Sequence, residues 1–241
     1  MVYSAWWLGT EEGHGNFGDI LTPFILDYYK INYKYTSSYS NADLISVGSI
    51  ARRASNKTTV LGSGIIRSND VLAPQADYKF VRGPHTRNRI LEQGGVCPEI
   101  YGDPALLLPK IYNPKIKKNI DIGYVPHNVD FEFINPRYNY VIHLSTKNYK
   151  DVIDKMLNCK KIVSSSLHGV IVAHAYGIPA AWVKSRKKLK GGRTKFEDYY
   201  ASVGLPAVMS TYENPIFSLP KSIDTSKIDK IFREFSNKGS V

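Results

Sequence analysis

The chain has 241 residues, with a hydrophobic content of 43% and a charged content of 22%, values that are ordinary for a soluble globular protein. No stretch approaches the apolar length of a membrane span, and the N-terminus lacks the basic and apolar regions of a secretory signal. The two cysteines lack metal-ligand spacing and are too few for a disulfide framework. We therefore expect a cytoplasmic protein, and the formal net charge of +11 favours an anionic partner.

Strand and helix patterns alternate along the chain. Apolar, β-branched runs predict strands at residues 44–48, 59–62, 79–81, 120–125, 140–144, 161–164 and 180–183. Helical patterns occupy residues 19–30, 84–93, 150–158, 167–176 and 196–203, and an amphipathic helix at 225–237 closes the chain. This alternation predicts an α/β fold with parallel sheets. The Pro- and Lys-rich stretch 109–119 indicates two small doubly wound, Rossmann-like domains, residues 1–112 and 113–241, facing across a cleft.

Two glycine-containing turns in the first half are candidate ligand sites. The turn GNFGD, residues 15–19, precedes an apolar helix that Asp19 can cap, and its glycines allow a ligand to approach the backbone closely. The turn GSG, residues 62–64, follows a strand but is too short for a dinucleotide fingerprint, and no P-loop occurs. The candidate substrate-binding residues at these turns are Asn16, Gly18, Asp19, Gly62, Ser63 and Gly64.

Arg82 and Asp103 lie at two further turns. Arg82, in VRGPH, is expected at the carboxyl end of a strand, where a guanidinium can bind a carboxylate or phosphate through two parallel hydrogen bonds. An ordinary ion pair explains Arg82 equally well. Asp103, in YGDP, is first a turn or cap residue and only secondarily a candidate catalytic carboxylate.

The segment 160–183 combines a strand, a serine-rich turn and a helix that opens at His168. A strand that passes into a helix through small residues leaves backbone N–H groups for an anion, so Ser164, Ser165 and Ser166 are candidate substrate-binding residues. His168 adds a titratable donor beside that anion, although a histidine there is also a common cap or surface residue. His174 lies on another face of the same helix and is expected to be structural.

Residues 184–195, KSRKKLKGGRTK, hold seven basic residues and no acid. This basic run is a solvated loop, a phosphate clamp over the His168 site or a contact with lipid phosphates. Lys184 and Lys195 at its ends are candidate substrate-binding residues. The chain has 17 tyrosines, but they do not interleave with the basic run, so nucleic acid is not an expected partner.

Seven pieces of the chain, taken together and in order, resemble the polysaccharide pyruvyl transferase family. They are GNFGD (15–19), VLGSGI (60–65), VRGPHTRNRI (81–90), YGDPALLLP (101–109), IGYVPH (122–127), SSSLHGVIVAHAYGIPAAWV (164–183) and FEDYYASVGLP (196–206). Some members of that family carry Arg-Leu-His at the helix start, where this chain has Ser166-Leu167-His168. Arg82 or the basic run would have to replace the missing arginine.

The resemblance implies a two-domain fold similar to the GT-B glycosyltransferase architecture. It also implies transfer of a pyruvyl group from phosphoenolpyruvate to sugar hydroxyls of a cell-surface polysaccharide or its lipid-linked precursor, usually as a cyclic ketal. His168 and Arg82 are then the candidate catalytic residues, with no cofactor or metal required. A lipid-linked acceptor would bring the protein into peripheral contact with the inner face of the membrane.

Two alternatives remain at this point. A nucleotide-sugar glycosyltransferase of GT-B type shares the architecture, but the pair of glutamates eight positions apart that is typical of retaining members is absent from the second half. A basic protein that binds nucleic acid or a membrane surface through residues 184–195 would show binding that falls steeply with salt.

Overall fold

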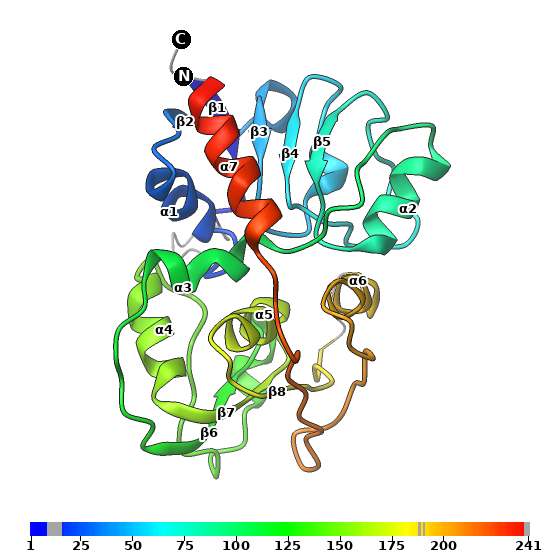
Figure 1. Ribbon diagram of the computed structural model, residues 1–241. Coiled ribbons are helices and arrows are strands. Elements are labelled where there is room, and N and C mark those ends of the chain that lie inside the picture. The colour runs from blue at the N-terminus through cyan, green and yellow to red at the C-terminus, as the bar shows by residue number, and fades with distance from the viewer. Residues whose placement is uncertain (9–15, 188, 190, 239–241) are drawn as a thin grey trace.

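The computed structural model describes residues 1–8, 16–187, 189 and 191–238 of the chain. These residues form two sheets, and the strands within each sheet are parallel (Figure 1). The predicted α/β class with parallel strands is therefore confirmed. The first sheet has the order β2-β1-β3-β4-β5, formed by β1 Val2–Ala5, β2 Tyr33–Tyr35, β3 Leu44–Ile45, β4 Thr59–Leu61 and β5 Asp77–Phe80. The second sheet has the order β6-β7-β8, formed by β6 Ile120–Val125, β7 Cys159–Ser164 and β8 Ala180–Trp182.

The order of the first sheet contains a switch point. Strand β2 lies on one side of β1, whereas β3, β4 and β5 continue on the other side. In open parallel sheets ligands bind at such a point, in the crevice outside the carboxyl ends of the strands. The segments that follow β1 and β3 therefore lie where a ligand is expected, and they carry Asp19 and Gly48.

Helices cover and connect the sheets. They are α1 Leu21–Tyr28, α2 Pro84–Glu92, α3 Leu108–Ile111, α4 Tyr149–Leu157, α5 Leu167–Ala175, α6 Thr194–Ser202 and α7 Ser226–Lys238, with 3₁₀ turns η1 Tyr39–Asn41, η2 Ala51–Arg53, η3 Pro104–Leu107 and η4 Asn128–Phe133. Local signals explain several starts: Pro84 occupies the first turn of α2, and the Asn148 side chain accepts from Asp151 N–H to cap α4. Within the described residues, no helix has both the length and the apolar character that crossing a bilayer demands.

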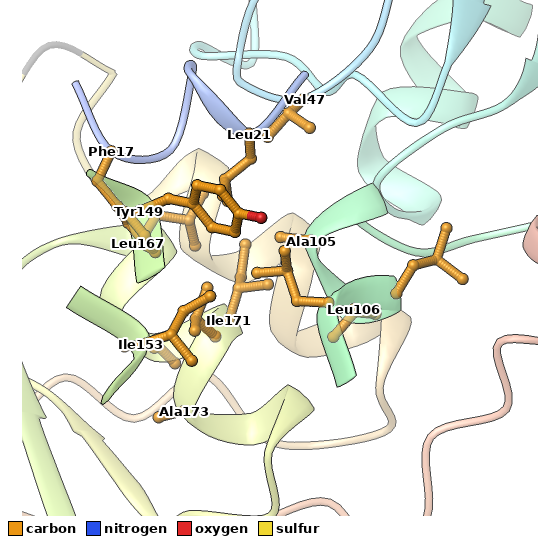
Figure 2. Close-up of a cluster of buried hydrophobic side chains, with 14 of the residues drawn as sticks. Phe17, Leu21, Val47, Ala105, Leu106, Tyr149, Ile153, Leu167, Ile171 and Ala173 are labelled. Atoms are coloured by element: carbon orange, nitrogen blue, oxygen red, sulfur yellow. The ribbon is translucent and has the colours of Figure 1, made fainter. Parts of the chain in front are cut away.

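One apolar core joins the two halves. It contains Leu21 and Ala105 from the first half together with Tyr149 and Ile171 from the second (Figure 2). Helix α5 is apolar on all sides, and its residues 167–174 are buried, as expected for a helix packed between layers. Because α5 starts at the carboxyl edge of β7 and packs against η3, side chains from both halves are brought to the start of α5.

Helix α7 returns to the first half, although the domain division predicted from the sequence groups it with residues 113–241. The Phe232 ring stacks on Tyr29 with centroids 4.9 Å apart, and the Tyr29 hydroxyl donates to Asp229 at 2.5 Å. Lys110 forms an ion pair with Asp229 at 3.2 Å. Figure 1 shows α7 (red) beside the first sheet. The domain boundary at 112/113 stays a prediction.

The prediction of a strand at residues 140–144 is wrong. Val141 forms only an isolated bridge with Tyr124, and Ile142 N–H donates to the Tyr124 carbonyl at 2.8 Å. Strand β6 ends at Val125, and Pro126 after it has no N–H with which to extend the ladder. Strands β1 and β2 were not predicted, because their sequences, VYSA and YKY, contain no run of apolar, β-branched residues.

Candidate functional site

The switch point of the first sheet brings Asp19 and Gly48 together. A Cβ at Gly48 would lie 2.6 Å from Asp19 Oδ1, and Gly48 has a φ of +111°, so this position requires glycine. A Cβ at Gly18 would lie 1.9 Å from Nδ1 of His168, which comes from the second half. The absence of a side chain at Gly48 leaves room for the Asp19 carboxylate, and its absence at Gly18 leaves room for the His168 imidazole. Both groups lie in one buried site.

His168 lies in the first turn of α5 and is 8% exposed. Its Nε2 is 3.7 Å from Asp103 Oδ2, and neither atom has a hydrogen-bond partner among the described residues. The other oxygen of Asp103 accepts from Ala105 N–H at 3.0 Å and caps η3. Because buried polar atoms are normally hydrogen-bonded, this unpaired couple is a strong sign of a ligand site.

Asp19 is the second carboxylate of the site and is 7% exposed. Burial raises the pKa of Asp19 from 3.8 to about 6, and the charges of His168 and Lys195 and a hydrogen bond from Asn16 Nδ2 limit the rise. A carboxylate with this pKa titrates near neutrality, so it suits proton transfer better than an ordinary aspartate.

Lys195 enters the same site from the first turn of α6 and is 9% exposed. Burial, and then the positive charge of Arg82, lower the pKa of Lys195 to about 8, whereas Asp19 acts in the opposite direction. Lys195 therefore remains charged at neutral pH. A residue of the basic run thus reaches the Asp19–His168 site.

His127 follows β6 and borders this group. Burial, and then the positive charge of Lys195, lower the pKa of His127 to about 4. Val129 N–H donates to its Nδ1 at 3.3 Å, which assigns the proton of the neutral ring to Nε2. Among the described residues, no three His, Cys, Asp or Glu side chains could together hold a metal ion.

The three predicted serines have different surroundings. Ser164 Oγ donates to the Val125 carbonyl at 2.7 Å, and Ser165 Oγ donates to Asp130 at 2.6 Å, so both hydroxyls are engaged by the protein. Ser166 is the N-cap residue of α5 but makes no side-chain cap hydrogen bond. Contact of these serines with a substrate stays a prediction, and Ser166 has the geometry that best allows it.

The turn formed by Gly62, Ser63 and Gly64 packs against other residues of the protein. A Cβ at Gly62 would lie 2.5 Å from Pro104, and one at Gly64 would lie 2.3 Å from the Arg82 guanidinium carbon. Ser63 Oγ donates to the Gly48 carbonyl at 2.9 Å. Protein neighbours account for these residue types, and their direct contact with a ligand stays a prediction.

Arg82 is fully buried rather than exposed at a strand end. Its guanidinium donates to Asp198 at 3.0 Å, to Ser49 Oγ at 2.6 Å and to the Ile65 carbonyl at 2.6 Å. Asp198 also accepts from the Thr86 hydroxyl at 2.7 Å. Binding of phosphoenolpyruvate by the Arg82 guanidinium through two parallel hydrogen bonds stays a prediction, and it would require displacement of Asp198. The charge of Arg82 lowers the pKa of Lys195 without any such rearrangement.

Other predicted residues lie at the margin. Lys184 is exposed and lines a pocket, whereas Gly15 of the first turn and Lys188 and Lys190 of the basic run lie outside the described residues. His174 is structural, as expected: its ring nitrogens are 3.0 Å from the Tyr199 hydroxyl and 3.0 Å from the Ser218 carbonyl.

The sequence does not predict Gly48, His127 or Asp130 as site residues. It indicates Asp103 mainly as a cap, although Asp103 lies 3.7 Å from His168. Gly48 and His127 share a positional signal, because each comes within three residues of the carboxyl end of a strand. Asp130 gives no such signal, because the hydrogen bonds that bury it come from residues 35 or more positions away.

The sequence model of a family described as polysaccharide pyruvyl transferase matches residues 9–186, about three quarters of the chain. The chain belongs to the polysaccharide pyruvyl transferase family. The region that matches this pyruvyl transferase model contains Asp19, Asp103, His127 and His168, whereas Lys195 and helices α6 and α7 lie beyond it.

Two curated relatives of this pyruvyl transferase family member are informative. The succinoglycan biosynthesis protein ExoV of Rhizobium meliloti is 28% identical over 81% of this chain and 64% of its own length. An uncharacterized protein of Acanthamoeba polyphaga mimivirus is 32% identical over 66% of this chain and 59% of its own length. The chain thus spans about 60% of the length of these relatives. No solved structure matches the chain significantly.

Proposed function

We propose that the chain transfers a pyruvyl group from phosphoenolpyruvate to two hydroxyls of a cell-surface polysaccharide, or of its lipid-linked precursor, and forms a cyclic ketal. The observation that carries this proposal is the buried group formed by Asp19, Asp103, His168 and Lys195. In the same proposal, residues 1–112 and 113–241 act as the two domains of a GT-B-like arrangement, with the reaction at their junction. A lipid-linked acceptor would bring the protein to the membrane surface as a peripheral protein.

The reaction removes one proton from each of two hydroxyls, and it delivers one proton to the methylene carbon and one to the leaving phosphate. Protonation of the methylene carbon of phosphoenolpyruvate leaves a cation at the neighbouring carbon, which one sugar hydroxyl attacks. Phosphate then leaves and the second hydroxyl closes the ring. The two hydroxyl protons balance the proton delivered to carbon and the proton that leaves with phosphate. General acid and base groups in fixed positions accelerate such steps by about two to four orders of magnitude each.

His168 is the general acid in this proposal. Asp103 Oδ2 lies 3.7 Å from His168 Nε2, and neither atom has a hydrogen-bond partner among the described residues. The trianionic donor adds further negative charge when it binds beside the first turn of α5. The pair therefore places an imidazole and a carboxylate together in the buried site where the proposal puts phosphoenolpyruvate.

Asp19 is the general base, and Lys195 binds the charged donor. A pKa of about 6 leaves Asp19 ionised at neutral pH but more basic than an exposed aspartate. A pKa of about 8 leaves Lys195 protonated at the same pH, so it is able to pair with the donor carboxylate or phosphate. The net charge of +11 attracts the donor over longer range.

Thermal shift tests the donor directly. Phosphoenolpyruvate should raise the melting temperature, because a ligand that binds only the native state at 100 times its Kd stabilises it by about 2.7 kcal/mol. UDP-glucose and a short oligonucleotide at the same concentration should leave it unchanged. A shift with UDP-glucose and none with phosphoenolpyruvate would instead support the glycosyltransferase alternative.

A further inference from the structure

A pocket of about 840 Å³ is lined by residues from both halves of the chain. Arg67 and Ser68, which follow β4, line one side, and Lys184, Lys187 and Thr194, which follow β8, line the other. Thr194 is adjacent in sequence to Lys195, whose side chain belongs to the buried site. The pocket therefore shares the first turn of α6 with Lys195 but is lined by other residues.

The lining of the pocket is strongly basic. Arg67, Lys184, Lys187 and Arg193 contribute to it, and none of the described residues that line it is acidic. The exposed side chains of Arg67 and Lys184 form no ion pair with a described residue. Such a cluster of cations in a hollow concentrates anions.

Buried contacts hold the walls of the pocket in place. The fully buried Asp130 accepts from Ser185 Oγ at 2.6 Å, from Arg186 N–H at 3.0 Å and from Lys187 N–H at 3.3 Å. It also accepts from Ser165 Oγ at 2.6 Å, which ties this wall to the turn before α5. On the opposite side, a Cβ at Gly191 would lie 2.0 Å from the Ile66 carbonyl oxygen, so the two walls approach closely there.

Hydrogen-bond donors accompany the positive charge. Ser68 and Thr194 line the pocket with hydroxyl groups, whereas the hydroxyl of Ser185 already donates to Asp130. Helix α6 starts at Thr194 without a side-chain cap, so its first-turn amides and its dipole favour an anion at that end. Arginine, lysine, hydroxyl and amide donors together form the set that binds phosphate oxygens.

We infer that this pocket binds a phosphate group carried by the sugar acceptor, which holds the acceptor hydroxyls near Asp19 and His168. The volume lies in the range of pockets for drug-sized ligands and exceeds what a three-carbon donor needs. A neutral saccharide would gain little from Arg67 and Lys184, whereas Lys187 and Arg193 already form ion pairs with Glu132 and Glu197. The inference rests on the proposed function, because that function defines the acceptor.

Single variants Arg67→Gln and Lys184→Gln test this site, with Lys34→Gln on the outer strand β2 as a charge-matched control. The direct probe is inorganic diphosphate, measured by calorimetry with the whole chain. We expect about tenfold weaker diphosphate binding in each pocket variant, equivalent to loss of one charge-assisted contact, and no change in the control. Saturating phosphoenolpyruvate should leave diphosphate binding intact.

Transfer kinetics supply the second readout, with lactosyl diphosphate and methyl lactoside as acceptors. The diphosphate acceptor should have the lower KM, and each pocket variant should raise that KM about tenfold while KM for phosphoenolpyruvate stays within about twofold. A raised KM for phosphoenolpyruvate, or competition between the donor and diphosphate, would assign the pocket to the donor and overturn the inference.

Two further outcomes separate the alternatives. If the variants weaken binding to vesicles with anionic lipid but leave lactosyl diphosphate kinetics unchanged, the residues contact a membrane surface and the inference is wrong. If wild type forms no ketal with either acceptor while diphosphate binding still depends on Arg67 and Lys184, the anion site stands. Its assignment to an acceptor then fails together with the proposed function.

Discussion

Burial raises the pKa of Asp19, which makes the carboxylate a better base and lowers the stability of the folded protein at neutral pH. Its pKa is raised from 3.8 to about 6, so the folded state holds the proton more tightly than the unfolded state. The stability that this provides is complete below about pH 4 and is lost as the pH rises through about 6. The shift corresponds to about 3 kcal/mol against the folded state at neutral pH, an energy that the surrounding core must offset.

Asp19→Asn should therefore stabilise the ligand-free protein at pH 8 by about 2–3 kcal/mol, because the amide has no charge to desolvate. At pH 4 the wild-type carboxyl is itself neutral, and the two proteins should differ little. Urea unfolding at both pH values measures this. An equal difference at pH 4 and pH 8 would show that ionisation of Asp19 is not the cause.

Lys195 should control the alkaline limit of donor use. Its pKa of about 8 means that it loses its charge above that pH, so kcat/KM for phosphoenolpyruvate should fall as the pH rises through 8. In Lys195→Arg the side chain remains protonated, and the fall should move to higher pH. Lys184→Arg serves as the control and should keep the wild-type profile. An identical alkaline fall in Lys195→Arg would remove Lys195 from donor binding.

At the residue scale the sequence indicated some members of the site. Asp19 and His168 stand at turns whose chemistry is readable from neighbouring glycines and serines. Asp103 was interpreted first as a cap, and it is one, but its second oxygen lies 3.7 Å from His168. Lys195 is recognisable in the sequence only as one end of a basic run. Its burial depends on the packing of α6, which the local sequence does not reveal.

At the scale of elements, α6 is attached to the first half through Asp198 and Arg82. Both side chains are completely buried, and the Arg82 guanidinium donates to Asp198 at 3.0 Å. Loss of one partner leaves a buried charge unpaired, so Asp198→Ala should lower the free energy of unfolding by about 3–5 kcal/mol.

Glu197→Ala is the matched control on the same helix. Glu197 pairs with Arg193 at 2.9 Å at the surface, where such a pair contributes about 0–1 kcal/mol. Urea unfolding of both variants makes the comparison. Similar small losses in the two would mean that the buried pair does not hold α6 to the first half.

Elements with strong local signals were predicted well. Helices α2 and α4 have Pro84 and Asn148 at their starts, and strand β6 matches the predicted bounds of 120–125. Strands β1 and β2 have no apolar, β-branched run that would mark a strand, and they are held in the sheet by pairing with neighbouring strands. The expected strand at 140–144 failed because β6, the strand beside it, is followed by a proline.

At the scale of the whole molecule, α7 fastens the chain end to the first half. Phe232 is completely buried, and its ring stacks on Tyr29. Truncating a buried phenylalanine leaves a cavity, so Phe232→Ala should lower the free energy of unfolding by about 3–5 kcal/mol. Phe235→Ala on the same helix removes a partly buried ring and should cost less. Equal losses would contradict the anchoring role of Phe232.

The meeting of the two halves was only partly predictable. The carboxyl-edge rule for parallel sheets explains why turns from distant segments converge on one site, and the alternation of strands and helices was readable. The return of α7 was not, because its amphipathic pattern shows that a face is buried without showing against which half. Contacts such as Tyr29 with Asp229, 200 positions apart, exist only in the fold.

The rate of ketal formation by wild type and His168→Ala, compared at pH 7, tests the central claim most directly. Both proteins receive phosphoenolpyruvate and the best acceptor from a panel of p-nitrophenyl hexosides and lactosyl diphosphate, and mass spectrometry quantifies the pyruvate ketal against released phosphate. The account predicts equal amounts of ketal and phosphate with wild type. It predicts a rate lower by about two to four orders of magnitude with His168→Ala at an unchanged melting temperature. A folded His168→Ala protein that forms ketal at the wild-type rate would contradict it.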